Sequence, residues 1–175
     1  MAKIGRIADL DFFGVVIRNR DFGGSKFGEN YRTFSIEVED PEVQEKLQQD
    51  GMELYFARPQ NNSEPPRAYM NVVVDNRYGD VQIALLSPDG SAVKLREKDF
   101  GAVDKAWITN ADLHVRLNGW EKNGKHGVTC YLKTMVAHLM SEEEQQEIKA
   151  RRASERDAVM NRYKNLFGDD ELPFN

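Results

Sequence analysis

The chain has 175 residues, of which 24 are Lys or Arg and 29 are Asp or Glu, giving a formal net charge of -5. This length allows one β-domain with a sizeable core plus an appendage, whereas a second independent core is not expected. Because no apolar run is long enough to cross a bilayer and the amino end lacks a signal-peptide pattern, we expect a soluble cytoplasmic protein without membrane contact. The single cysteine, Cys130, excludes an internal disulfide. Together with the three histidines it matches no zinc spacing, so neither a metal nor a cofactor is expected.

The charges are unevenly divided along the chain. Up to Met140 there are 18 basic and 20 acidic residues, while the remaining 35 positions hold 6 basic and 9 acidic residues. A net negative charge argues against nucleic-acid binding, which depends on clustered Lys and Arg at phosphates. The body is nearly neutral, however, so the grouping of its charges matters more than their sum.

The first elements in chain order are two strands, residues 4–17 and 31–38. In the second strand Phe34, Ile36 and Val38 alternate with polar residues, which predicts that these three face a core. The connector 18–30 contains three glycines, two phenylalanines and three basic residues, and it is long for a hairpin turn. We interpret it as a functional loop.

A short helix should follow over residues 41–50, with Asp40 as its N-cap, Pro41 in its first turn and Gly51 as its stop. Further strands are predicted at 53–58, 67–75 and 81–86. The first two of these are separated by a polar, proline-containing loop. Residues 91–106 give no clear prediction.

The strongest strand pattern lies in residues 107–139, where two strands flank the loop GWEKNGKHG. A capping box formed by Ser141 and Glu144 then predicts a helix that runs to residue 167 and stops at Gly168. The inward positions of the two strands are predicted to be Leu113, Val115 and Leu117 in the first, and Val128, Cys130, Leu132, Thr134 and Val136 in the second. Tyr131, Lys133 and Met135 are predicted to point outward.

The outward positions combine aromatic and basic residues, which are the two ingredients that hold single-stranded nucleic acid: bases stack on aromatic faces and cations follow the phosphates. The candidate stacking residues are Tyr31, Tyr69, Trp120 and Tyr131, with Tyr55 also outward. The candidate phosphate-binding residues are Arg18, Arg20, Lys26, Arg32, Arg58, Arg67, Arg77, Arg116, Lys122, Lys125 and Lys133. Any one of these residues is more often half-buried or simply solvated, so the prediction depends on the whole set.

Three further aromatic residues need separate interpretations. Trp107 is expected to pack inside. Phe22 and Phe27 flank a Gly-Gly pair in the loop 18–30, and they either clamp bases or pin the loop to the body; the sequence does not choose between these two roles.

The end of the chain, DDELPFN, places acids directly before an apolar tip. Such a segment offers an apolar anchor for a pocket and carboxylates for a basic rim. A solubility tail would need no Leu172, Pro173 or Phe174. We therefore predict a protein-interaction tip formed by Asp169, Asp170, Glu171, Leu172, Pro173 and Phe174.

This tip resembles the C-terminus of bacterial and phage single-stranded DNA-binding proteins, which end in acids, an apolar residue, Pro and Phe; here Asn175 follows Phe174. Residues 111–139 are also similar to the closing strands of phage members, with their Trp, Asn-Gly-Lys turn and Tyr-Leu-Lys strand. The resemblance implies a mainly β, OB-fold-type five-stranded barrel with extra strands, one short helix and a C-terminal helical arm. It also implies sequence-independent binding and protection of single-stranded DNA in replication, recombination and repair, in a host cytoplasm, with replication or recombination proteins recruited by the tip.

The expected organisation is a DNA-binding domain at 1–140, a helical arm at 141–167 and the tip at 168–175, with self-association left open. Two alternatives remain. One is a β-barrel adaptor that binds only proteins. The other is a magnesium-dependent nuclease that would use Asp75 and Asp80, although the sequence has no catalytic motif and we expect no enzyme activity.

Overall fold

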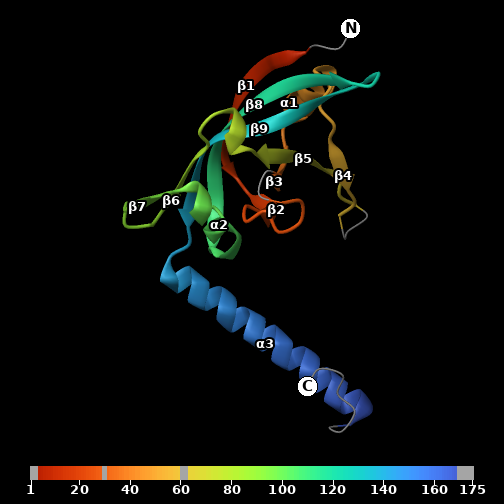
Figure 1. Ribbon diagram of the computed structural model, residues 1–175. Helices are drawn as coiled ribbons and strands as arrows, with labels where there is room; N and C mark the ends of the chain where they lie inside the picture. Colours follow the sequence, from red (N-terminus) through yellow and green to blue (C-terminus); the bar gives the residue numbers. More distant parts are fainter. Residues whose placement is uncertain (1–3, 29–30, 60–62, 169–175) are drawn as a thin grey trace. The chain divides into compact units, whose positions relative to one another are not determined.

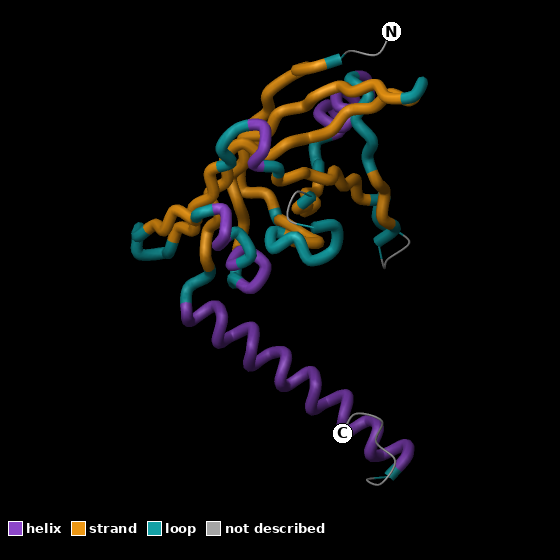
Figure 2. The backbone as a smooth tube through the Cα atoms, viewed as in Figure 1, coloured by secondary structure: helices purple, strands orange, loops and turns teal. Residues whose placement is uncertain are grey.

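The computed structural model describes residues 4–28, 31–59 and 63–168 (Figures 1 and 2). It divides into two compact units, residues 1–139 and residues 140–175, and each is described by itself. Figure 2 shows that the first unit consists mostly of strands and loops, with short helical segments between them.

Nine strands form one mixed sheet within the described residues. They are β1 (Gly5–Val15), β2 (Ile17–Asp21), β3 (Arg32–Glu37), β4 (Tyr55–Ala57), β5 (Arg67–Val74), β6 (Gln82–Leu86), β7 (Ala92–Leu95), β8 (Ile108–Lys122) and β9 (Lys125–Leu139). The order is β1-β8-β9-β5-β3-β2, with β4 on β5, β6 on β9 and β7 on β6. The β5–β9 and β6–β9 pairs are parallel and the others are antiparallel.

The predicted five-stranded barrel is corrected to this larger sheet, whose hydrogen-bonded order does not close. β1 and β2 stand at its two ends and are not paired with each other, although only Val16 separates them in the chain. The predicted strand 4–17 is thus interrupted at Val16, two residues after Gly14, whose φ of +63° lies in the left-handed region. β2 then extends into the predicted loop as far as Asp21.

Alternation predicted the core of these strands correctly. Phe34, Ile36 and Val38 are at most 2% exposed, and Leu113, Val115 and Leu117 of β8 are at most 3% exposed. These side chains form one cluster with residues of β5, including Met70 and Val72. The core therefore lies on the inner face of the sheet, and the remaining alternate positions face outward.

The predicted phase of β9 is wrong in its second half. Met135 is fully buried, whereas Thr134 is exposed and Val136 is half-buried. The register explains the change, because His114 pairs with Thr134 while the next residue, Val115, pairs with Leu132. Lys133 is thus an extra residue in a β-bulge, and such a residue switches every later side chain to the other face.

The helices connect and cover these strands. They are α1 (Pro41–Gln49), α2 (Ala102–Lys105), α3 (Glu142–Phe167) and the 3-10 segments η1 (Asn76–Tyr78) and η2 (Glu97–Asp99). In α1 the Asp40 carboxylate accepts a hydrogen bond from the Glu42 N–H, and Leu47 is buried. The unassigned stretch 91–106 contains β7, η2 and α2, and it sends Phe100 and Val103 into the core.

The second unit is dominated by α3, drawn in blue in Figure 1. The Ser141 hydroxyl accepts a hydrogen bond from the Glu144 N–H, and the Gly168 N–H donates to the Lys164 carbonyl. The helix therefore begins and ends as its capping residues predicted. Most of its side chains are exposed.

The loop after β2 is fixed at its start by Asp21 and Phe22. Phe22 is fully buried and stacks on Phe34, with ring centroids 4.9 Å apart. The Asp21 carboxylate accepts hydrogen bonds from the Ser25 hydroxyl, the Ser25 N–H and the Lys26 N–H at 2.8 to 3.0 Å. Asp104 of α2 accepts two more, from the backbone of Phe22 and Gly23.

Acid should loosen this loop. Burial acts to raise the pKa of Asp21, but the hydrogen bonds from Lys26 and Ser25 outweigh it and hold the pKa below the ordinary 3.8. A lowered pKa stabilises the folded state above pH 3.8, and this stability is lost as the pH falls through the lower folded value. Thermal unfolding measured from pH 7 to pH 2 should show a smaller loss below pH 4 for Asp21→Asn than for the wild type. An equal acid response in both proteins would contradict this account.

Candidate nucleic-acid interface

One aromatic and basic group lies on the outer face of β2, β3, β5 and β4. Tyr69 of β5 is flanked in register by Tyr55 of β4 and by Glu37 of β3. The Arg18 guanidinium of β2 lies 5.9 Å from the centroid of the Tyr69 ring. Tyr55 is about half exposed and Tyr69 is partly covered, so flat aromatic surface is presented beside a cation.

Polar side chains lie in the next row of the same face. Arg18 pairs in register with Ser35, and Ser35 pairs with Asn71. The Ser35 hydroxyl donates a 2.8 Å hydrogen bond to the Asn71 side-chain oxygen. Asn71 is exposed, and its amide nitrogen points away from Ser35. Asn71 was not predicted, because it is neither aromatic nor basic. Asn71 is two residues from Tyr69 in β5, so the two-residue period that placed Tyr69 on the outer face would have placed Asn71 there too.

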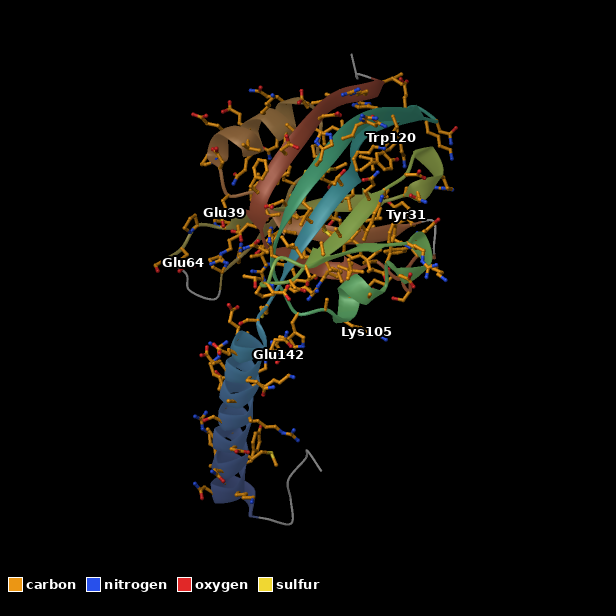
Figure 3. All side chains as sticks on the ribbon, turned by 90° about the vertical axis from the view of Figure 1, so that its left-hand side faces the viewer. Tyr31, Glu39, Glu64, Lys105, Trp120 and Glu142 are labelled. Carbon is orange, nitrogen blue, oxygen red and sulfur yellow. The ribbon has the colours of Figure 1, made fainter. Side chains whose placement is uncertain are left out.

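Trp120 lies at the end of the β8–β9 hairpin and is 41% exposed (Figure 3). Its indole lies over its cross-strand partner Gly127, because a Cβ added at Gly127 would come within 2.7 Å of the ring atom Cζ2. The ring borders a hollow of about 490 Å³ that Glu53 and Lys125 also line. One face of the Trp120 indole therefore packs on the backbone of Gly127, while the ring still lines the open hollow.

The hairpin tip carries two exposed cations, Lys122 and Lys125. Between them Asn123 and Gly124 have φ values of +54° and +78°, the left-handed conformations that a tight hairpin turn requires. The tip thus holds both cations at the end of the hairpin that carries Trp120.

Tyr131 belongs to the outer face but to a different row. It pairs with Val73 of β5 and with Arg116 of β8, four residues along β8 from Trp120 and so about 13 Å away along that strand. The Arg116 guanidinium donates a 3.0 Å hydrogen bond to Asp9. This bond is the main cause that lowers the pKa of Asp9 and raises the pKa of Arg116. Much of the charge of Arg116 is therefore already paired.

The loop after β2 provides a third aromatic group. Tyr31 and Phe27 are 49% and 67% exposed, and their rings meet edge to face at 5.8 Å. The buried Phe22 pins the loop, whereas Phe27 is exposed at the surface beside the exposed Lys26. The two phenylalanines that sequence could not distinguish thus have different environments.

Besides Arg116, three more of the predicted phosphate-binding residues have structural partners. Arg32 is 6% exposed and pairs with Glu97 at 3.3 Å, while Arg20 donates to the carbonyls of Val103 and Ala106. Arg77 binds Asp75 at 2.8 Å, and this hydrogen bond is the main cause that lowers the pKa of the Asp75 carboxyl. We therefore place Arg32 and Arg20 outside the candidate interface, and Asp75 is engaged rather than open for a metal.

The other predicted cations are more accessible. Lys133, in the bulge, is half-buried, and Arg67 lies 3.9 Å from both Glu37 and Glu64. Exposed side chains among the predicted set are Arg18, Lys26, Arg58, Arg67, Lys122 and Lys125, and Arg77 is exposed as well although it binds Asp75. The predicted tip, residues 169–174, lies outside the described residues. None of the helices within the described residues is long and apolar enough to cross a membrane.

The sequence matches the family described as "Putative phage ssDNA-binding domain" over residues 2–166. The chain belongs to this family. The match spans nearly the whole chain, including β1 to β9 and almost all of α3. Among curated proteins, none matches the sequence.

Two solved structures from bacteriophage Enc34 share the fold, and a third is similar to it. A C-terminal truncation of the Enc34 single-stranded DNA-binding protein matches with a TM-score of 0.50 at 7% identity, covering 80% of this chain and 97% of that chain. The Enc34 protein itself matches at 0.50 and 6% identity, covering 77% and 82%. Its complex with ssDNA matches at 0.49 and 7% identity, covering 81% and 98%.

Proposed function

We propose that this chain coats single-stranded DNA without sequence preference, with the strand lying across the outer face of β2, β3, β5 and β4 and reaching the β8–β9 hairpin. Membership of a phage ssDNA-binding family gives the class of ligand. The observation that carries the site is the Arg18, Tyr69 and Tyr55 group, in which a cation lies beside neighbouring aromatic rings on an outward face. Stacking on such rings is sequence-tolerant because every base has a flat face.

The charges of the sheet support this location. On the outer face of β1 and β8, Asp9 and Asp11 lie beside His114, and Asp112 binds His138. Asp9 is paired with Arg116, so the repulsion of phosphates on this face comes mainly from Asp11 and Asp112, whose ion-pair partners are histidines. The exposed cations Arg18 and Lys26 lie on β2 and the loop after it, and Lys122 and Lys125 lie at the tip of the β8–β9 hairpin, so the backbone of the strand has its favourable partners there.

The finer fold assignment is also a proposal. β1 and β2 act as two halves of one bent strand, one half pairing with β8 and the other with β3. An OB-fold is a partly open five-stranded barrel that binds oligonucleotides on its second and third strands and on the loops beside them. In that interpretation β3 and β5 carry the site, while the loop 22–31 and the β8–β9 hairpin border it.

A titration with oligo-dT of increasing length tests the function directly. Tryptophan emission should be quenched as bases stack, and affinity should rise with length until one site is filled, with steep weakening by salt. Oligonucleotides of mixed sequence should bind alike. If emission stays unchanged and no gel shift appears at low salt, DNA binding at this site is wrong and the adaptor alternative gains support.

We further propose that the chain acts in replication, recombination and repair within a host cell. Residues 1–140 would bind DNA, 141–167 would form an arm, and the acidic tip at 168–175 would recruit partner proteins. The support is the sequence of the tip, in which Asp169, Asp170 and Glu171 precede Leu172, Pro173 and Phe174.

Deleting residues 169–175 should tighten DNA binding at low salt by a few fold. The three carboxylates compete, as part of the same chain, with phosphates for the exposed cations. Gel-shift affinities at low and high salt measure this effect, which should disappear at high salt. A variant that replaces only Asp169, Asp170 and Glu171 with Asn, Asn and Gln is the matched control and should behave like the deletion. Unchanged or weaker DNA binding in both variants would contradict the proposed competition between the tip and DNA.

A further inference from the structure

An apolar hollow of about 180 Å³ lies where β1 passes into β2, and of its lining residues Glu37 also borders the Tyr69 group. The most exposed apolar side chains of the hollow are Phe13, at 78%, and Val16, at 48%. Phe12, Val15, Val38 and Val43 complete the apolar lining. We call this the β1–β2 hollow. An exposed phenylalanine beside a depression is typical of a docking surface rather than of a solvated strand.

The rim of the β1–β2 hollow is acidic. Glu37, Glu39 and Asp40 line it, and Glu39 and Asp40 are exposed. Figure 3 labels Glu39 and Trp120 on opposite sides of the body, so the hollow and the Trp120 hairpin are separate surfaces. Carboxylates around an apolar depression disfavour both DNA and the acidic tip, and they favour an apolar segment with basic neighbours.

The helix α3 offers a surface of this kind. Side chains spaced three or four residues apart share one face of a helix. From Lys149 to Tyr163 one such stripe holds only basic and apolar residues and no carboxylate: Lys149, Arg152, Arg156, Val159, Met160 and Tyr163. Arg156 and Val159 are exposed. The stripe extends over about 21 Å of helix, so it offers an apolar anchor together with cations for a rim.

We propose that the α3 stripe of one copy docks in the β1–β2 hollow of a second copy, with Val159 and Met160 against Phe13 and Val16 and with Arg156 near Glu39. The proposal goes beyond DNA binding, because it assigns a role to the α3 stripe and to Phe13 and Val16, which the proposed DNA site does not include. Two different surfaces are joined, so the contact is heterologous and repeats from copy to copy unless the copies close into a ring. Repetition along a strand would make DNA coating cooperative.

Cross-linking between two differently tagged proteins tests the contact without DNA, so its outcome is independent of the proposed function. One protein carries Glu39→Cys in the rim and the other carries Ala153→Cys beside the stripe. A short bis-maleimide should join them into a mixed dimer. Native Cys130 should not interfere, because it is buried and burial raises the pKa of its thiol.

The matched control replaces Ser154, the next residue, which lies about 100° further around the helix. Ser154→Cys should give at least about fivefold less mixed dimer than Ala153→Cys. Equal yields from the two positions would overturn the proposal. It would also be overturned if a diluted Glu39→Cys/Ala153→Cys double variant cross-linked only within one copy, which would show that the arm covers its own hollow.

Charge reversal tests the consequence on DNA. Arg156→Glu and Glu39→Arg should each weaken binding to long oligo-dT by about fivefold while leaving binding to a one-site oligonucleotide unchanged. The double variant should recover the long-oligonucleotide affinity, because opposite charges face each other again. If both single variants coat long DNA like the wild type, no contact between copies at this hollow assists coating. If no protein binds DNA at all, the proposed function fails while the cross-linking result still stands.

Discussion

Replacing Trp120 with alanine should weaken binding to single-stranded DNA by about 5- to 150-fold. Stacking of a base on an aromatic side chain contributes about 1–3 kcal/mol. Trp120 suits this role because its indole rests on Gly127 and borders an open hollow beside Lys125. The loss should be equal for oligo-dT and for mixed sequences, because stacking does not read base edges. Gel-shift or anisotropy titrations against both ligands measure it.

Two controls make the Trp120 result specific. Trp120→Phe keeps an aromatic ring and should recover most of the affinity. Phe13→Ala removes a more exposed aromatic residue from the separate acidic hollow and should leave affinity for a one-site oligonucleotide unchanged. The partly buried Trp107 remains in Trp120→Ala, so the variant still fluoresces but should lose most of its quenching by DNA. If Trp120→Ala has unchanged affinity, Trp120 does not belong to the DNA site, and the Tyr69 group is the remaining candidate.

Local rules account for the parts of the fold that sequence predicted well. Alternation identified Phe34, Ile36 and Val38 as core residues, and Ser141 and Gly168 marked the ends of α3. These signals lie within a few residues of the feature that they predict. Two-residue periodicity and capping are properties of a short segment, so they do not depend on the rest of the sheet.

The features of the fold that the sequence predicted wrongly depend on partners that are distant in the chain. The bulge at Lys133 exists only relative to β8, and nothing in the β9 pattern alone marks it. The extension of the sheet beyond five strands depends on β6 pairing in parallel with β9, about fifty residues away. A parallel pair needs a long crossover, so its existence is decided by packing rather than by local pattern.

For the candidate interface, the sequence contained more information than the prediction used. The alternation that places Phe34 and Ile36 in the core also places Arg32 on the inner side, where it is buried against Glu97 and Phe100. Asn71, by contrast, is outward by the same rule. The sequence could not predict that Arg20 donates to the carbonyls of Val103 and Ala106, because these partners lie more than 80 residues away in the chain.

Replacing Phe22 with alanine should lower the free energy of unfolding by about 3–5 kcal/mol, the usual cost of deleting a buried phenylalanine. Phe22 is fully buried and stacks on Phe34, so its removal leaves a cavity beneath the loop and deletes a ring contact. Phe27, which is 67% exposed in the same loop, is the matched control. Its replacement by alanine should change stability by less than about 0.5 kcal/mol. Urea unfolding of both variants measures the difference.

The two phenylalanine variants should also differ in their effect on DNA binding, which separates anchoring of the loop from direct contact. If Phe27 and Tyr31 touch the strand, Phe27→Ala weakens binding at unchanged stability. Phe22→Ala would then weaken binding only through the loop that carries them, so a ligand in excess should restore part of its stability by mass action. Because the Asp21 and Asp104 carboxylates still hold the loop backbone in Phe22→Ala, the loop keeps part of its anchoring. Equal stability of the two variants would mean that Phe22 does not pin the loop, and the loop's placement would then depend on these hydrogen bonds alone.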